Sequence, residues 1–124
     1  MKKITVDEAL SQLKHGFFPK CEISRDLLKP VKSEQELQNF LKLSTVQKCQ
    51  FYGYEQDEIK NFKVPDGGLE LSVNEATDML FEGKKVYARV IGENERSFMD
   101  LNSFVAFLRK CNINGDNFLL YLRD

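Results

Sequence analysis

One half of this chain repeats the other half. When the sequence is displaced by 67 positions, Ile4–Ala9 lies over Leu71–Ala76, and the match continues without a gap. Further pairs at the same displacement are Leu13 with Leu80, Gly16 with Gly83, Ile23 with Val90, Phe40 with Phe107, and Tyr54 with Tyr121. A register that persists over this length predicts a tandem duplication, with copies at residues 1–57 and 69–124 and a linker at residues 58–68.

Each copy opens with the pattern of a helix start. Thr5–Glu8 and Ser72–Glu75 both have the form of a capping box, in which the hydroxyl and the glutamate each accept a hydrogen bond from a backbone N–H of the first turn. Apolar residues follow at helical spacing, and Gly16 or Gly83 then suits a left-handed helix end. The sequence therefore predicts a short helix at the start of each copy.

After this helix, apolar residues occur at every second position instead of at helical spacing. Val86–Ile91 alternates in this way, which predicts a half-buried strand, and its counterpart in the first copy is Phe17–Ser24. Gly92–Glu95 has turn chemistry, so Arg96–Met99 is expected to return antiparallel. A second, less marked hairpin is expected through Arg25–Leu28.

A second helix and a closing strand complete each copy. Pro30 lacks an N–H and restricts the strand before this helix to a sheet edge. Ser33 and Asp100 are matched N-cap residues, and each is followed by an apolar face, Leu37, Phe40 and Leu41 in one copy and Phe104, Phe107 and Leu108 in the other. Aromatic-rich strands at Gln50–Glu55 and Asn117–Leu122 end the copies.

This order of elements predicts an α+β fold, a tandem duplication of an αββαβ unit with antiparallel sheets and helices packed on one face. A unit of this size with a three-stranded sheet buries little surface by itself, so each copy is expected to depend on the other. We therefore expect a pseudo-two-fold arrangement and one cooperative body.

The charge balance excludes a strongly basic or a strongly acidic protein. Lys and Arg total 18 against 19 for Asp and Glu, which argues against a basic nucleic-acid binder and against an acidic mimic of DNA. No apolar run is long enough to cross a bilayer, and Met1–Thr5 lacks the apolar stretch of a secretion signal. We therefore expect a cytoplasmic protein with no membrane contact.

The residues that commonly carry catalysis are few. His15 is the only histidine and precedes Gly16 at a predicted helix end, where it serves as a capping residue. Cys21, Cys49 and Cys111 are far apart, form no C-x-x-C pair and are expected to act as small buried apolar residues. We expect no catalytic residue, no metal site and no cofactor.

Aromatic and cationic residues on the predicted strands are the best candidates for a binding surface. Tyr52 and Tyr54 flank a glycine on the closing strand of the first copy, so at least one of them should point outward. Tyr87, Arg89 and Arg123 are candidates in the second copy, since Tyr and Arg are typical anchor residues of interfaces. Alternation of Tyr87 with Arg89 also leaves open a surface that stacks RNA or single-stranded bases.

One stretch resembles a known group of small proteins. Leu71–Val86, and less closely Thr5–Gly16, is similar to the helix-glycine-strand opening of small phage and mobile-element proteins. Among them are the phage-encoded Thoeris anti-defence proteins, which sequester a cyclic nucleotide signal. The tryptophan that typically follows in that family is absent here, so the resemblance carries over no ligand-binding residue and implies a mobile-element context.

Together these features favour a non-enzymatic binding protein. The expected role is that of a mobile-element-encoded inhibitor that binds a bacterial defence protein, such as a CRISPR effector, in a fixed stoichiometry. Sequestration of a cyclic nucleotide-type small ligand is one alternative. Binding of RNA or single-stranded nucleic acid is the other.

Overall fold

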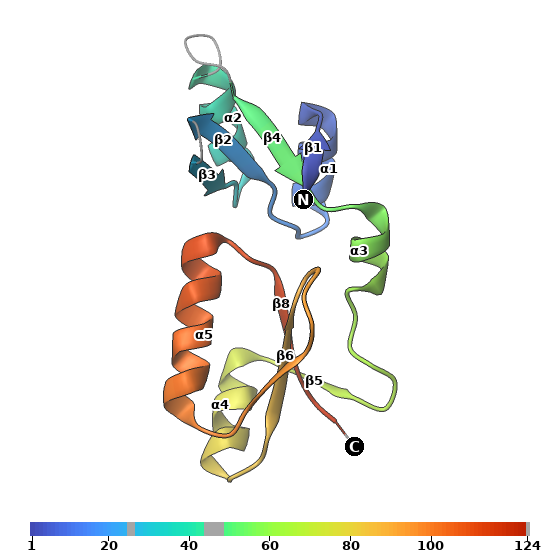
Figure 1. The fold of residues 1–124 in the computed structure, drawn as a ribbon, viewed down its shortest axis with the longest axis vertical. Coiled ribbons are helices and arrows are strands. Elements are labelled where there is room, and N and C mark those ends of the chain that lie inside the picture. Colours follow the sequence, from blue (N-terminus) through green and yellow to red (C-terminus); the bar gives the residue numbers. More distant parts are fainter. Residues whose placement is uncertain (25–26, 44–48, 124) are drawn as a thin grey trace. The chain divides into compact units, whose positions relative to one another are not determined.

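The computed structural model describes residues 1–24, 27–43 and 49–123, and within these the chain forms two compact units, Met1–Gln56 and Asp57–Asp124. Each unit combines a four-stranded antiparallel sheet with helices (Figure 1), which confirms the predicted α+β class and its two similar units. Arg25 and Asp26, the turn of the hairpin predicted in the first copy, lie outside the described residues.

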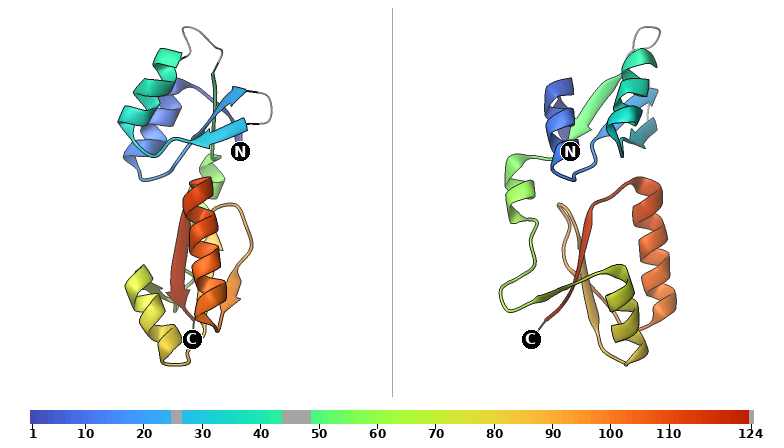
Figure 2. Two further views of the ribbon diagram at one scale, coloured as in Figure 1. Left: turned by 90° about the vertical axis from the view of Figure 1, so that its left-hand side faces the viewer. Right: turned by 180° about the vertical axis from the view of Figure 1, so that it is seen from behind.

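The described residues of the first unit form six elements, with helices α1 and α2 on the same face of the sheet (Figure 2). In chain order they are β1 (Lys2–Ile4), α1 (Val6–Lys14), β2 (Lys20–Ser24), β3 (Leu27–Pro30), α2 (Glu34–Leu43) and β4 (Gln50–Gly53). The strands lie in the order β1-β4-β2-β3. The buried core between the sheet and the helices consists of Ile4, Ala9, Cys21, Val31, Leu37 and Phe51.

The second unit repeats this arrangement after a short helix. Its elements are α3 (Gln56–Asn61), which begins at the boundary between the units, β5 (Leu69–Leu71), α4 (Val73–Phe81), β6 (Val86–Val90), β7 (Arg96–Phe98), α5 (Leu101–Asn114) and β8 (Phe118–Leu122). The strand order is β5-β8-β6-β7. Helices α4 and α5 cover one face of this sheet, and the chain from α3 to β5 runs along the other (Figures 1 and 2).

The helices begin where the sequence predicts. Both capping boxes are complete: the Glu8 N–H donates to the Thr5 hydroxyl at 3.1 Å, and the Glu75 N–H donates to the Ser72 hydroxyl at the same distance. At the end of α1 the His15 ring donates from Nδ1 to the Ser11 carbonyl at 2.8 Å. The local capping chemistry of these sequences is therefore sufficient to place the helix ends.

The prediction of three strands in each sheet was wrong, because β1 and β5 add a fourth. Each is three residues long and stands immediately before a helix N-cap, so it is too short to show an alternating pattern. Each pairs with the last strand of its own unit, β1 with β4 and β5 with β8. Helix α3 is a second addition, and it occupies the start of the segment 58–68 for which the sequence predicts a linker.

The two copies do not keep one displacement over their whole length. Lys20 pairs with Pro30 in the first sheet and Tyr87 with Ser97 in the second, which preserves the displacement of 67. In the closing strands Lys20 pairs with Tyr52, but Tyr87 pairs with Tyr121. The closing strand of the second copy is therefore shifted by two residues, and the structural counterpart of Tyr121 is Tyr52, whereas the gapless match predicts Tyr54.

A buried glutamine holds the end of β4 in the first unit. The side chain of Gln12 is 5% exposed, donates from Nε2 to the Tyr54 carbonyl at 2.9 Å, and accepts from the Tyr54 N–H at 3.2 Å. Gly53 makes this approach possible, since a Cβ at that position would lie 2.6 Å from Oε1 of Gln12. The corresponding residues of the second unit, Met79 and Leu122, pack against the apolar core instead.

Candidate functional site

The first candidate surface is the face of the first sheet that lies opposite its helices. Tyr52 stands in the middle of this face, with Lys3 directly across from it on β1 and Lys20 directly across on β2. Its hydroxyl donates to Oε2 of Glu22 at 2.8 Å, and this hydrogen bond raises the pKa of Tyr52. We call this surface the Tyr52 face.

Apolar and charged groups of both signs meet on the Tyr52 face. Its side chains line an open hollow of about 570 Å³, formed by Met1, Lys20, Glu22, Leu28 and Tyr52. Leu28 is 48% exposed and Met1 is exposed to a similar degree. A half-exposed tyrosine beside exposed apolar side chains and a charged rim has the composition of a protein interface.

Tyr54, which the sequence places beside Tyr52 as a candidate binding residue, does not lie on this face. It is 4% exposed and packs edge-on against Phe17, with ring centroids 6.4 Å apart. Strand β4 ends at Gly53, and Gln12 holds the backbone of Tyr54 beneath the helices. The alternation of the strand therefore does not reach Tyr54, and of the two tyrosines only Tyr52 is a surface residue.

In the second unit the corresponding face carries a stacked pair of tyrosines. The rings of Tyr87 on β6 and Tyr121 on β8 are 6.1 Å apart and nearly parallel, with an interplanar angle of 14°. The ammonium group of Lys85 lies 5.9 Å from the Tyr87 centroid, and the guanidinium carbon of Arg123 lies 5.7 Å from it. The structure therefore brings together Tyr87 and Arg123, two of the candidates chosen from the sequence.

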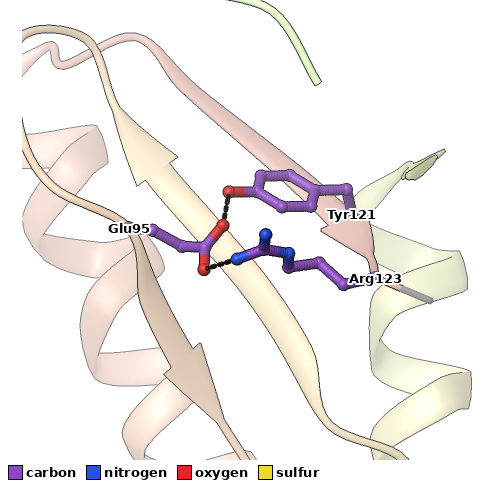
Figure 3. A network of polar contacts seen from close by, with 3 residues as sticks. All are labelled: Glu95, Tyr121 and Arg123. Carbon is purple, nitrogen blue, oxygen red and sulfur yellow. Dashed lines mark hydrogen bonds and ion pairs between the residues drawn. The ribbon is translucent and has the colours of Figure 1, made fainter. Parts of the chain in front are cut away.

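Glu95 links these groups into a polar network (Figure 3). Its carboxylate accepts a short hydrogen bond from the Tyr121 hydroxyl and an ion-paired hydrogen bond from Arg123 Nη1 at 2.7 Å. The hydrogen bonds from Tyr121 and Arg123 lower the pKa of Glu95. Burial, together with the bond to Glu95, raises the pKa of Tyr121 to about 12.

Arg89 serves the fold of the second unit. Its Nη2 donates to the carbonyls of Asn61 and, at 3.2 Å, Lys63, and its guanidinium carbon lies 5.9 Å from the centroid of the Phe62 ring. It therefore holds the C-terminal end of α3, where carbonyls without helical partners favour a cation. A hollow of about 270 Å³ beside it is lined by Asp57, Glu58, Asn61, Phe62, Arg89, Gly92 and Glu93.

Among the residues of these faces that the sequence does not single out are Glu22, Glu95 and Tyr121. The sequence gives Glu95 the role of a turn residue, and nothing local reveals that it reaches β8. Tyr121 was matched with Tyr54, and the shift of two residues hid its similarity to Tyr52. Both tyrosines in fact donate to a glutamate, Glu22 or Glu95, on the outer side of their sheets.

No group of three or more metal-ligating side chains is present among residues 1–24, 27–43 and 49–123. Within the same residues, no helix has the length and apolar content needed to span a membrane. No family model, no curated protein and no solved structure matches this chain.

Proposed function

We propose that this chain is a non-enzymatic binding protein that forms a stoichiometric complex with a protein partner through the Tyr52 face. One observation carries the proposal. The same structural position holds a tyrosine in both units, and Tyr121 is 1% exposed, whereas Tyr52 remains half-exposed beside Leu28. A large amphipathic ring that is covered in one copy and open in the other is a natural contact for a partner.

The charges around Tyr52 favour a protein over a polyanion. Lys3 and Lys20 flank the ring across the sheet, but Glu22 lies within hydrogen-bonding distance of its hydroxyl. A nucleic-acid surface requires cations gathered on one face, and the chain as a whole carries a net charge of −1. Mixed charge around an aromatic centre is typical of the rim and core of a protein interface.

The class of partner that we propose is a bacterial defence protein, bound and inhibited by a protein of a mobile element. This part rests on the resemblance of Leu71–Val86 to small phage and mobile-element proteins. A small body that covers a functional surface of its target needs no catalytic residues to inhibit it. The proposal therefore concerns occupancy of a surface and not turnover of a substrate.

A second candidate function, sequestration of an anionic nucleotide-type ligand, is favoured by the cluster around Tyr87. Two cationic side chains, Lys85 and Arg123, lie within 6 Å of the centroid of this ring. A base that stacks on Tyr87 would place its phosphate near these cations. Arg123 is already paired with Glu95, so an anionic ligand would have to compete with that carboxylate.

A capture experiment tests the main proposal. The parent chain and the variants Tyr52→Ala and Lys20→Glu are immobilised and exposed to a bacterial host lysate. Lys110→Glu is the matched control, because it makes the same charge reversal at an exposed position of α5. We expect the parent and the control to retain the same protein in a complex of fixed stoichiometry by native mass spectrometry, and both Tyr52-face variants to lose it.

Two results would argue against the Tyr52 face as the interface. One is the absence of any specifically retained protein, and the other is retention that is indifferent to Tyr52→Ala. Equilibrium binding to cyclic nucleotides and to single-stranded RNA at several salt concentrations tests the two alternatives. Binding of either ligand that is lost in Tyr87→Ala, with no captured protein, would favour the second unit as the functional site.

A further inference from the structure

The two units differ at the contact between the third strand and the second helix. In the second unit Phe98 of β7 fills this contact, with its ring centroid 5.8 Å from that of Phe104 and 5.1 Å from that of Phe107. The guanidinium carbon of Arg96 lies 5.7 Å from the Phe107 centroid. The gap between β7 and α5 is thus closed by an aromatic side chain of the chain itself.

In the first unit the same positions carry smaller or differently shaped residues. Val31 stands where the second unit has Phe98 and is completely buried, and Lys29 stands where it has Arg96. Beside them is a groove of about 390 Å³, lined by Lys29, Pro30, Lys32, Glu36, Asn39 and Phe40. We call it the β3–α2 groove.

The β3–α2 groove has an apolar floor and a cationic rim. Pro30 and the half-exposed Phe40 provide the apolar surface, and the ammonium groups belong to Lys29 and Lys32. The carboxylate of Glu36 accepts the backbone N–H of Lys32 at 2.8 Å, so it is held in place by the turn before α2. An aromatic or aliphatic side chain with a carboxylate beside it complements this lining.

Strand β3 borders the groove and is the edge of its sheet among the described strands. The Val31 N–H donates to the Pro19 carbonyl at 2.8 Å, so the backbone N–H of Val31 points toward the segment that contains β2. Because hydrogen-bonding directions alternate in an antiparallel pair, the N–H and C=O of Leu28 and the C=O of Pro30 point to the open edge. Pro30 thus stands where its missing N–H would face solvent.

We propose that an extended peptide segment of a protein partner adds to β3 as a further strand, places an aromatic side chain in the β3–α2 groove and sets an acidic side chain against Lys29 and Lys32. When a peptide adds as a strand to a sheet edge, its backbone hydrogen bonds provide affinity and the pockets for its side chains provide specificity. An aromatic occupant is inferred from the second unit, where the ring of Phe98 packs against Phe107, the counterpart of the groove residue Phe40. The proposal rests on the proposed function, a protein that binds proteins.

Selection of displayed peptides tests this inference. Random 12-residue peptides are selected on the parent chain, and the enriched peptides are then measured against four variants. Leu28→Pro removes the outward N–H and leaves the pairing with β2 intact, and Leu28→Ala is its matched control because it keeps that N–H. Lys29→Glu reverses the charge of the rim, and Lys110→Glu makes the same reversal on α5.

We expect the enriched peptides to share an aromatic residue and a nearby acidic residue, without proline. Their dissociation constants should be about tenfold or more higher in Leu28→Pro than in Leu28→Ala, and about tenfold or more higher in Lys29→Glu than in Lys110→Glu. Bound peptide should also slow hydrogen exchange of the Leu28 amide in the parent. Circular dichroism of each variant, matched to the parent, shows that the fold is retained.

Several outcomes would overturn the inference. One is the absence of any enriched peptide, and another is a set of enriched peptides that bind Leu28→Pro as tightly as the parent. A third is a concentration-dependent dimer that Leu28→Pro abolishes, because it would show that a second copy of the chain occupies the edge of β3. If the captured partner is lost in Tyr52→Ala but retained by both Leu28→Pro and Lys29→Glu, the inference fails and the proposed function stands. If no protein is captured while peptides bind as described, the proposed function of the Tyr52 face fails and the inference about the β3–α2 groove stands.

Discussion

Replacement of Gln12 by methionine should be among the most damaging single changes to the first unit. Methionine is the residue that the second unit carries at this position, Met79, and it has a similar length. The change removes two hydrogen bonds with the Tyr54 backbone, one donated by Gln12 at 2.9 Å and one accepted by it at 3.2 Å. Loss of a hydrogen bond to a buried polar group costs about 1–3 kcal/mol, so the loss of two gives about 2–6 kcal/mol.

The apolar methionine offsets part of this loss, and we expect the free energy of unfolding to fall by about 2–4 kcal/mol. Urea unfolding followed by far-ultraviolet circular dichroism measures it, with a midpoint lowered by about 1–2 M for a protein of this size. Met79→Leu is the control, since a volume-conserving exchange in the second unit should cost less than about 1.5 kcal/mol.

A double-mutant cycle with Gly53→Ala makes the test specific. The added Cβ would lie 2.6 Å from Oε1 of Gln12, so it must displace the atom that accepts the Tyr54 N–H. Each change removes the same hydrogen bond, and the double variant should therefore be more stable than the sum predicts by about 0.5 kcal/mol or more. A Gln12→Met protein within about 0.5 kcal/mol of the parent, or strict additivity, would refute this account.

Further predictions concern the core, the polar network, the thiols and the cooperativity of the chain. Phe107→Ala should lower the free energy of unfolding by about 3–5 kcal/mol. Phe40→Ala should lower it by less, because Phe40 is only half-buried at the groove, and urea unfolding of the two variants measures the difference. The carboxyl group of Glu95 has a lowered pKa in the folded chain, so its ionised form stabilises the fold above the unfolded pKa, and this stabilisation is lost as pH falls through the folded pKa. Glu95→Gln should therefore make Tm depend less on pH on the acid side of a plot of Tm against pH. Burial raises the pKa of the Cys21 thiol to about 12 and that of Cys111 to about 11, so a disulfide reagent should modify both only after unfolding, and rapid labelling of either in the native protein would contradict their burial. The cooperative body predicted from the sequence requires Gln12→Met and Phe107→Ala to shift one shared unfolding transition, and two transitions that each respond to one variant would contradict it.

The sequence was sufficient for those features that are written locally. Capping residues, glycines at helix ends and the periods of the apolar residues placed four helices and the longer strands of both units. Strands β1 and β5 were missed because their pairing is entirely with distant segments. Helix α3 was missed because only six residues form it, and the hydrogen bonds from Arg89 that hold its end come from another element.

The shift of two residues in the closing strand was invisible to the sequence for a physical reason. Side chains of a strand alternate between two faces, so a displacement of two residues compares inward residues with inward residues. The gapless match therefore sets Phe51 against Phe118, and the apolar pattern agrees although the hydrogen-bonded register does not. The sequence therefore predicted only that at least one of Tyr52 and Tyr54 points outward, and it did not reveal that Tyr52 corresponds to Tyr121.

The pairing of the first strand with the last also governs the order in which each unit can be completed. Lys2 pairs with Gly53, and Leu69 pairs with Leu122, so the sheet of either unit remains open until its final strand has been synthesised. The hairpins of β2 with β3 and of β6 with β7 close short loops and can form early, whereas the outer strand must wait for a contact distant in sequence. On the ribosome, the first unit would thus be left with an unpaired edge and an uncovered core until Gly53 emerges from the exit tunnel.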